Sequence, residues 1–256
     1  MHARISALFA ALLTAVAVAG CGPDGGAGER DELVVSAATS LKSAFTSYAG
    51  RLAGAEVRFS FAGSDELAAQ IRAGARPDVF AAANTTLPEQ LFADGLVERP
   101  QVFAANRLVL AVPARSAKVR SFVDIRNDGV TLVIGAAGVP IGSYTRAVQR
   151  RVDGATRRRI LANVRSNEPD VGGISAKLTQ GAADAGFLYV TDVVAANGRL
   201  KAIELPRGLQ QDVAYAVAIV KGAPNRSSAR AFVAGLRDGA GSDALHAAGF
   251  TPAFAP

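Results

Sequence analysis

Four short segments of the 256-residue chain are glycine-rich or carry small and hydroxyl-bearing residues, and none of them contains lysine or arginine. Each stands where a helix is predicted to begin, at Leu41, Asp65, Tyr144 and Val171. A helix start presents backbone N–H groups without partners inside the helix, and the positive end of the helix dipole, about half a charge. Several converging starts therefore form an anion site without any basic side chain. The four segments are residues 37–40, 62–64, 138–143 and 167–170.

The polar residues of these segments also have a simpler explanation. Ser40, Ser64 and Asp170 are all good N-cap residues, and such a cap stabilises a helix by about 1 kcal/mol. Taken one at a time, each is better explained as a cap than as a ligand. Four such starts after four strands favour an oxyanion or phosphate site, and a serine hydroxyl adds a further donor.

The elements that position these segments alternate between strands and helices. Buried strands are predicted from apolar or alternating runs, and helices from apolar residues three and four positions apart. This alternation predicts a parallel sheet with helices on both faces. The predicted strands are 33–38, 56–61, 78–83, 107–112, 131–136, 185–190 and 213–220. The predicted helices are 41–52, 66–73, 87–94, 144–152, 171–180, 229–237 and 242–248, with a short helical turn at 122–125.

About a dozen elements over the folded part suit two α/β lobes. The strands at 107–112 and 213–220 are apolar and long enough to cross between them. A ligand is then expected in the cleft, at the carboxyl ends of the strands.

The composition excludes several functional classes. The chain is half hydrophobic, only 20% charged, and has a net charge of +6. Tryptophan is absent and the aromatic residues are scattered, which argues against a nucleic-acid partner. The densest basic run, Arg150, Arg151 and Arg157 to Arg159, is expected to be a solvated helix face. One cysteine and two histidines make an internal disulfide, a multi-cysteine zinc site and a hydrolase triad improbable.

The N-terminus has the features of an export signal. His2 and Arg4 give a short basic start, and an apolar run of about fifteen residues follows, too short to span a bilayer comfortably. The run ends in residues 18–21 (VAGC), which resemble the bacterial lipobox, so we expect a signal peptide at 1–20 and a lipidated Cys21. The glycine-rich residues that follow make 21–30 a flexible tether. An ordinary signal peptide with a chance cysteine is the alternative.

Five stretches in order along the chain resemble the substrate-binding proteins of molybdate ABC transporters. They span nearly the whole folded part, and together they are a far stronger signal than any one alone. They are residues 37–41 (AATSL), 61–71 (FAGSDELAAQI), 74–83 (GARPDVFAAA), 139–144 (VPIGSY) and 181–192 (GAADAGFLYVTD).

The resemblance implies an α/β, two-lobed periplasmic-binding-protein fold of type II, with the ligand cleft between the lobes. Residues 31–108 and 217–256 are expected to form the first lobe and 109–216 the second. Ser40 and Ser64 would each supply a hydroxyl and a backbone N–H, Ile141 and Val171 a backbone N–H, and Tyr189 its phenol. Without the family pattern, a buried tyrosine at a strand end would be taken as core.

The implied function is capture of a tetrahedral oxyanion, molybdate or tungstate, by a monomeric, extracytoplasmic, lipid-anchored receptor. It would deliver the ion to the membrane permease of an ABC transporter. Neither enzymatic activity nor a cofactor is expected, and no side chain would ligate a metal directly, since molybdenum is bound as the oxyanion.

Two residues depart from the family pattern. Ile141 stands where the family often has a smaller residue, and Asp65 where it often has a second serine. A carboxylate facing the ligand would repel a dianion but accept the proton of hydrogenphosphate, whereas a donor-only site suits a fully deprotonated ion. A sulfate or phosphate receptor on the same fold therefore stays open. So do an enzyme using carboxylates such as Asp184 and Asp192, and a surface lipoprotein without a ligand.

Overall fold

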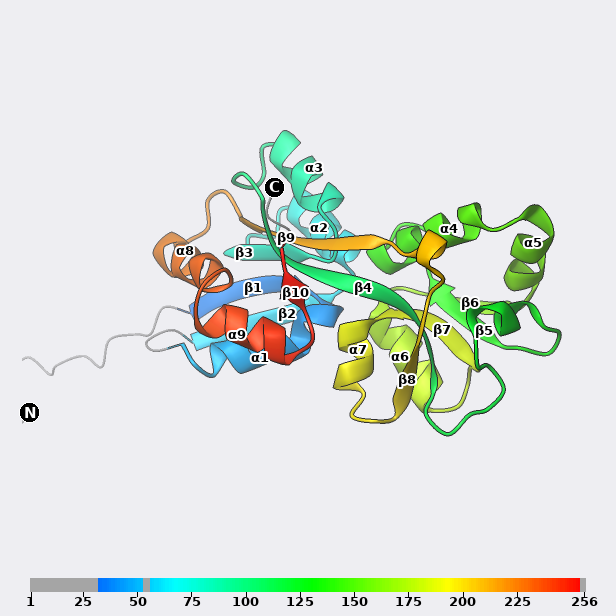
Figure 1. The fold of residues 1–256 in the computed structure, drawn as a ribbon. Helices are drawn as coiled ribbons and strands as arrows, with labels where there is room; N and C mark the ends of the chain where they lie inside the picture. Colours follow the sequence, from blue (N-terminus) through cyan, green and yellow to red (C-terminus); the bar gives the residue numbers. More distant parts are fainter. Residues whose placement is uncertain (1–31, 53–55, 254–256) are drawn as a thin grey trace, which may run out of the picture.

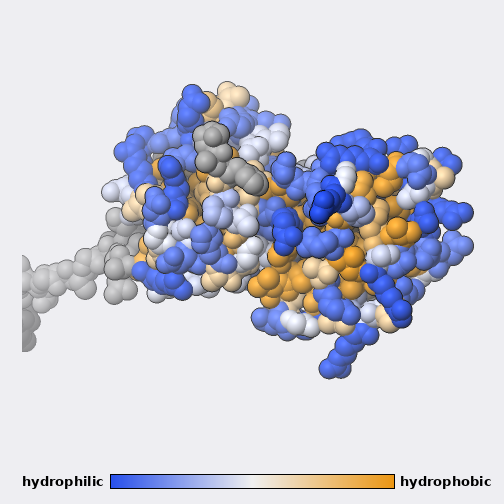
Figure 2. Space-filling model, viewed as in Figure 1, coloured by the Kyte–Doolittle hydropathy of each residue, from blue (hydrophilic) through white to orange (hydrophobic). Residues whose placement is uncertain are grey.

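The computed structural model describes residues 32–52 and 56–253, and their elements form two lobes (Figure 1). In the space-filling view the lobes are two bulges, and hydrophilic residues cover much of this face (Figure 2). The first lobe contains both ends of the described chain. Its elements are β1 (Glu32–Ala38), the 3-10 turn η1 (Thr39–Leu41), α1 (Lys42–Ala49), β2 (Glu56–Ala62), α2 (Ser64–Arg72), β3 (Val79–Ala82), α3 (Thr86–Ala93), α8 (Arg226–Gly235), α9 (Ala240–Ala247) and β10 (Thr251–Pro252).

The second lobe is formed by the middle of the chain. Its elements are η2 (Phe122–Arg126), β5 (Leu132–Gly135), α4 (Pro140–Arg151), α5 (Gly154–Ala162), β6 (Val164–Glu168), α6 (Val171–Thr179), β7 (Ala185–Tyr189), α7 (Val190–Ala195), β8 (Leu200–Glu204) and η3 (Arg207–Leu209). Two longer strands connect the lobes, β4 (Gln101–Pro113) and β9 (Asp212–Ile219).

Strand β4 is shared between the lobes. Its residues up to Arg107 pair with β9, and its residues from Leu108 onward pair with β7 and β8. The strand order is β2-β1-β3-β9-β4-β7-β5-β6, so β9 and β4 lie between the parallel strands of the two lobes. The two-lobed α/β architecture is therefore confirmed. The division at 108/109 and 216/217 stays a prediction; β9 pairs with β4 from Asp212 onward.

The predicted parallel pairing is found within each lobe but not where the two lobes join. Strands β1, β2 and β3 are parallel, as are β5, β6 and β7, but β4 and β9 are antiparallel to their neighbours. The physical reason is that the chain enters the second lobe on one of these strands and returns by the other, so the two run in opposite directions.

Several elements were not predicted, among them four that are too polar or too short to show an apolar period. Helix α5 carries three successive arginines. Strand β6 consists mostly of polar residues and is the last strand in the order, and most residues of β8 are exposed. Helix α7 has only six residues. The five arginines of the basic run lie at the end of α4 and on α5, and all five are exposed as expected.

A core of buried aliphatic and aromatic residues holds each lobe together. In the first lobe Phe45 of α1 packs edge-on against Phe232 of α8, with ring centroids 5.3 Å apart. In the second, Ile174 of α6 and Phe187 of β7 are fully buried. These contacts orient α1 and α6 so that their first turns face the boundary between the lobes.

Candidate functional site

All five predicted ligand residues line one small cavity between the lobes. Its volume is about 20 Å³, little more than the space that a single water molecule requires. The first lobe contributes the start of η1, the start of α2 and the end of β3; the second contributes the starts of α4 and α6 and the end of β7. The lining residues are Ala38, Thr39, Ser40, Ala62, Gly63, Ser64, Ala83, Val139, Pro140, Ile141, Pro169, Asp170, Val171 and Tyr189.

The helix starts converge as predicted, but one of them begins earlier. Helix α4 starts at Pro140, not at Tyr144, because proline fits the first helical position, where no N–H is required. Ile141 therefore lies in the first turn, where its backbone N–H has no partner within the helix. Val171 holds the equivalent place in α6, and Ser64 in α2. Three positive helix ends thus point at one cavity.

Neither serine is an N-cap. Gly63 caps α2 and Ala38 precedes η1, and no side-chain cap bond is made at either position. The Ser64 hydroxyl instead accepts a hydrogen bond from the backbone N–H of Ala83, at 3.1 Å. This bond leaves the Ser64 proton free to be donated into the cavity. The capping explanation holds only for Asp170, whose Oδ1 accepts from the N–H of Gly173 at 3.0 Å.

The phenol of Tyr189 is buried at the cavity wall without a hydrogen-bond partner among the described residues. Its ring is held edge-to-face by Tyr144 and Tyr215, with centroids 6.3 and 5.9 Å away. Burial, above all, raises the pKa of Tyr189 well beyond its ordinary value, so the hydroxyl keeps its proton. A buried donor without a partner is rare in folded proteins and calls for an explanation, of which a bound ligand is one.

Two contacts between the lobes close the cavity. The hydroxyl of Thr39 in the first lobe donates to Oδ2 of Asp170 in the second, at 2.8 Å. Beside it, Gly63 lies so close to the carbonyl oxygen of Pro169 that a Cβ at Gly63 would be 2.8 Å from it. Because both oxygens of Asp170 accept hydrogen bonds from the protein, its carboxylate is occupied although it lines the cavity.

The cavity presents almost only donors. No lysine, arginine or histidine lines it, and Asp65 is not among its lining residues. The positive potential comes from helix ends, and the directed donors are hydroxyls. Such a site suits a small anion that carries no proton of its own.

Sequence reasoning missed two residues of this arrangement. Thr39 was read only as part of a helix start, and Tyr215 only as part of an apolar strand. Thr39 contacts Asp170, 131 residues away along the chain, and Tyr215 contacts Ser40, 175 residues away. No local sequence pattern predicts either contact.

Comparisons with known proteins place the chain in a family. The model of the bacterial extracellular solute-binding proteins matches residues 33–251. The chain belongs to this family. The molybdate-binding protein ModA of Mycobacterium tuberculosis is 36% identical over 95% of this chain and 97% of its own length. The resemblance to molybdate-binding proteins is thereby confirmed.

Two solved structures share the fold of this solute-binding protein. The periplasmic molybdate-binding protein of Azotobacter vinelandii superposes with a TM-score of 0.78 at 21% identity, covering 87% of this chain and 100% of that one. The substrate-binding domain of a putative molybdenum ABC transporter from Clostridium difficile gives 0.66 at 26% identity, covering 87% and 99%. Membership in a solute-binding family also confirms that the chain is not an enzyme.

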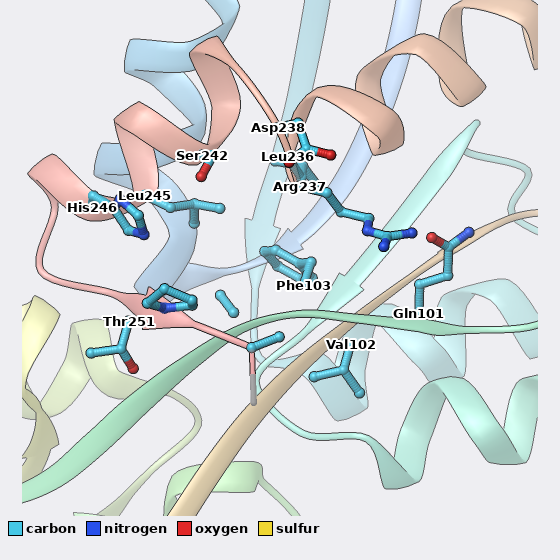
Figure 3. A pocket seen from close by; sticks show the side chains of 13 residues that line it. Gln101, Val102, Phe103, Leu236, Arg237, Asp238, Ser242, Leu245, His246 and Thr251 are labelled. Atoms are coloured by element: carbon cyan, nitrogen blue, oxygen red, sulfur yellow. The ribbon is translucent and has the colours of Figure 1, made fainter. Parts of the chain in front are cut away.

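A much larger hollow of this solute-binding protein lies elsewhere on the first lobe (Figure 3). It measures about 830 Å³ and is bordered by Phe103, Arg237 and His246, among others. None of the five predicted ligand residues lines it, and the start of α9, at Ser242, is the single helix start among its lining residues. Size alone would therefore select a different place from the one that the sequence predicts.

The predictions for the N-terminus fall outside the described residues, since the signal peptide, Cys21 and the tether precede Glu32. Within the described part of this family member, no helix has the length and apolar character required to cross a bilayer. In the same part, no group of three or more His, Cys, Asp or Glu residues is placed to hold a metal ion.

Beside the site, Asp192 provides a testable pH dependence. Burial raises its pKa from 3.8 to about 7; the N–H of Tyr189, which donates to its Oδ2 at 2.9 Å, opposes the shift, and the charge of Asp170 adds to it. The folded protein therefore binds this proton more tightly than the unfolded chain. Protonation of Asp192 therefore stabilises the folded state relative to the unfolded chain. This contribution to the free energy of unfolding is complete below about pH 4 and is lost as the pH rises to about 7.

We expect the variant Asp192→Asn to lack this contribution, because its amide oxygen still accepts from Tyr189 but does not titrate. The measurement is the free energy of unfolding of both proteins from about pH 4 to about pH 7. Other carboxyl groups titrate alike in both, so the difference between the two curves isolates Asp192. Parallel curves would show that Asp192 is ionised in the folded protein throughout.

Proposed function

We propose that this protein captures molybdate or tungstate outside the cytoplasm and delivers it to the permease of an ABC transporter. The observation that carries the proposal is the unpartnered phenol of Tyr189 at a small cavity between the lobes that three helix starts also line. The M. tuberculosis relative is a molybdate-binding protein, and the C. difficile neighbour belongs to a putative molybdenum ABC transporter.

In this proposal the ligand shell is made of hydroxyls and backbone amides. Ser40 and Ser64 each donate a hydroxyl and an N–H, Ile141 and Val171 donate an N–H, and Tyr189 donates its phenol. The donors are preorganised, because the helix starts and the packed tyrosine rings hold them in place before the ion arrives. They replace the water around the dianion, while the helix dipoles offset its charge.

Selectivity follows from the protonation of the ion. Molybdate, tungstate and sulfate offer only acceptors, whereas hydrogenphosphate carries a proton that needs an acceptor in the site. The carboxylate of Asp170 is occupied, and Asp65 does not line the cavity, although its Oδ1 is buried without a partner among the described residues. A phosphate receptor would need that oxygen to face the ligand. Sulfate is smaller than molybdate and is expected to fill the cavity less completely.

Calorimetric titration of the purified protein with molybdate, tungstate, sulfate and phosphate tests the proposal. We expect tight binding of molybdate and tungstate, weaker binding of sulfate and none of phosphate. Clear heat from phosphate together with none from molybdate would reject it. A protein that binds none of the four, and whose melting temperature none of them raises, would be a lipoprotein without an oxyanion ligand.

The remaining parts of the proposal concern the cell envelope. A diacylglycerol on Cys21 and a glycine-rich tether would keep a monomeric receptor at the membrane, near its permease. Replacing Cys21 by Ser should release the protein from the membrane fraction while leaving molybdate binding unchanged. Retention of the variant in that fraction would contradict lipidation.

The bond between Thr39 and Asp170 leads to a prediction about closure. Replacing Thr39 by Val keeps the shape of the side chain but removes the hydroxyl that joins the lobes and occupies Oδ2 of Asp170. Hydrogen bonds to charged groups contribute about 1.5–3 kcal/mol, and about 1.4 kcal/mol corresponds to a tenfold change. We therefore expect molybdate affinity to fall about tenfold or more, chiefly through faster dissociation. Dissociation rates from rapid-mixing competition experiments provide the measurement.

Thr39→Ser is the matched control, since it keeps the hydroxyl and should bind nearly as well as the natural protein. Equal dissociation rates for the Val and Ser variants would show that this bond does not hold the lobes closed.

A further inference from the structure

One buried oxygen near the cavity has no part in the ligand shell. Oδ1 of Asp65 is buried and receives no hydrogen bond from any described residue. Asp65 stands in the first turn of α2, directly after Ser64, yet it does not line the cavity. Buried oxygens without a donor are rare in folded proteins, so the burial of this one needs an explanation of its own.

The oxygen lies at the boundary between the lobes. A Cβ at Gly63 would be 2.9 Å from Oδ1 of Asp65 and 2.8 Å from the carbonyl oxygen of Pro169. Asp65 belongs to the first lobe, whereas Pro169 belongs to the second, in the loop between β6 and α6. Two oxygens from opposite lobes therefore approach one point, in a gap that exists because residue 63 is a glycine.

This contact is unfavourable, because a carboxylate and a carbonyl both accept hydrogen bonds and donate none. The Asp65 oxygen has left water without finding a donor in the protein, and such a loss of hydration is not compensated. The oxygen also carries negative charge beside the negative end of the Pro169 carbonyl dipole. When the lobes separate, water reaches the oxygen again and the cost disappears.

A favourable contact lies next to it along the chain. Asp170, the residue after Pro169, accepts from the hydroxyl of Thr39 in the first lobe at 2.8 Å. The boundary therefore has one contact that favours the closed arrangement of the lobes and one that opposes it. A boundary in which every acceptor met a donor would hold the lobes together more firmly and retain the ion longer.

We propose that Asp65 opposes closure of the lobes and thereby sets how fast the bound ion is released. The inference rests on the proposed function, since the release rate matters for a receptor that must hand its ion on. It assigns Asp65 an effect on binding kinetics that needs no contact with the ligand.

Asp65→Asn tests the proposal, because it keeps the shape of the side chain and replaces one oxygen by a donor. The amide is able to direct an N–H at the carbonyl of Pro169, so the unfavourable contact becomes a hydrogen bond. We expect molybdate to dissociate about 3- to 10-fold more slowly, with a matching rise in affinity and an unchanged association rate. Rapid-mixing competition experiments give the rates, and calorimetry gives the affinities.

Glu66→Gln is the matched control. Glu66 lies in the same first turn of α2 but is exposed, and its replacement removes the same charge. Both variants therefore lose a similar interaction with the helix dipole. The control should leave the dissociation rate unchanged. If Glu66→Gln slowed dissociation as much as Asp65→Asn, or if Asp65→Asn had no effect, the proposal would be overturned.

A second variant removes the buried oxygen without adding a donor. Asp65→Ala should slow dissociation relative to the natural protein, but less than Asp65→Asn does. Dissociation from the Ala variant that is as fast as from the natural protein would contradict a cost of burying this oxygen.

The ligand-free protein provides a measurement that does not depend on the identity of the ion. Asp65→Asn should favour the closed arrangement of the lobes and so lower the radius of gyration in small-angle X-ray scattering, whereas Glu66→Gln should not. Equal radii for the Asn variant and the natural protein would overturn the proposal. A natural protein that binds no molybdate would overturn the proposed function and leave this comparison valid.

Discussion

Replacing Tyr189 by Phe should weaken molybdate binding about 10- to 100-fold and yet raise the melting temperature of the ligand-free protein by a few degrees. The hydroxyl has no partner among the described residues, so its removal costs the folded protein no hydrogen bond. It relieves instead the cost of burying an unpaired polar group, about 1–3 kcal/mol. The ion, by contrast, loses a charge-assisted bond of about 1.5–3 kcal/mol.

Calorimetry and thermal unfolding with and without molybdate give both quantities. Tyr48→Phe is the matched control, because the Tyr48 hydroxyl donates to the carbonyl oxygen of Phe232 at 3.2 Å and does not line the cavity. Its changes should have the opposite pattern. It should lower the melting temperature and leave affinity unchanged. If Tyr189→Phe bound molybdate as tightly as the natural protein, Tyr189 would be a core residue and not a ligand.

Replacing Gly142 by Ala should be strongly destabilising. Gly142 lies in the first turn of α4, and a Cβ there would overlap the carbonyl oxygen of Ala136 and lie 2.7 Å from that of Gly135. Both atoms belong to the backbone and have no freedom to rotate away. Overpacking of this kind costs about 3 kcal/mol, or roughly 10 °C in melting temperature for a chain of this size.

Gly138→Ala is the matched control in the same loop, because a Cβ at Gly138 meets nothing within 4 Å. It should leave stability unchanged or slightly higher. The Gly142 variant should also bind molybdate less well, since any shift of α4 moves the N–H of Ile141. Equal melting temperatures for the two variants would show that α4 adjusts to the added methyl group without strain.

Much of the candidate site was predictable because it is made of local features. A few neighbouring residues are enough to encode each of them: the start of a helix, a small residue that lets the backbone come close to a ligand, and a serine in the first turn. The order of strands and helices was visible for the same reason, since buried elements have apolar periods. Helix α5 and strand β6 were not predicted, because their polar residues show no apolar period.

The early start of α4 was also within reach of local reasoning. Pro140 is a recognised first residue of a helix, and this rule places Ile141, rather than Tyr144, in the first turn. The antiparallel placement of β4 and β9 was not within reach, because it depends on how the chain passes between the lobes.

By itself, the sequence predicted the groups that line the cavity: the first turns at Ser64, Ile141 and Val171, the serine hydroxyls and the phenol of Tyr189. Only the tertiary structure decided what those groups face and which way they point. The bond from Thr39 to Asp170 and the contact between Ser40 and Tyr215 join residues more than a hundred positions apart. Such contacts form when distant segments of the chain pack together. This packing produces no periodic pattern in the sequence of either segment, so the sequence alone does not predict it.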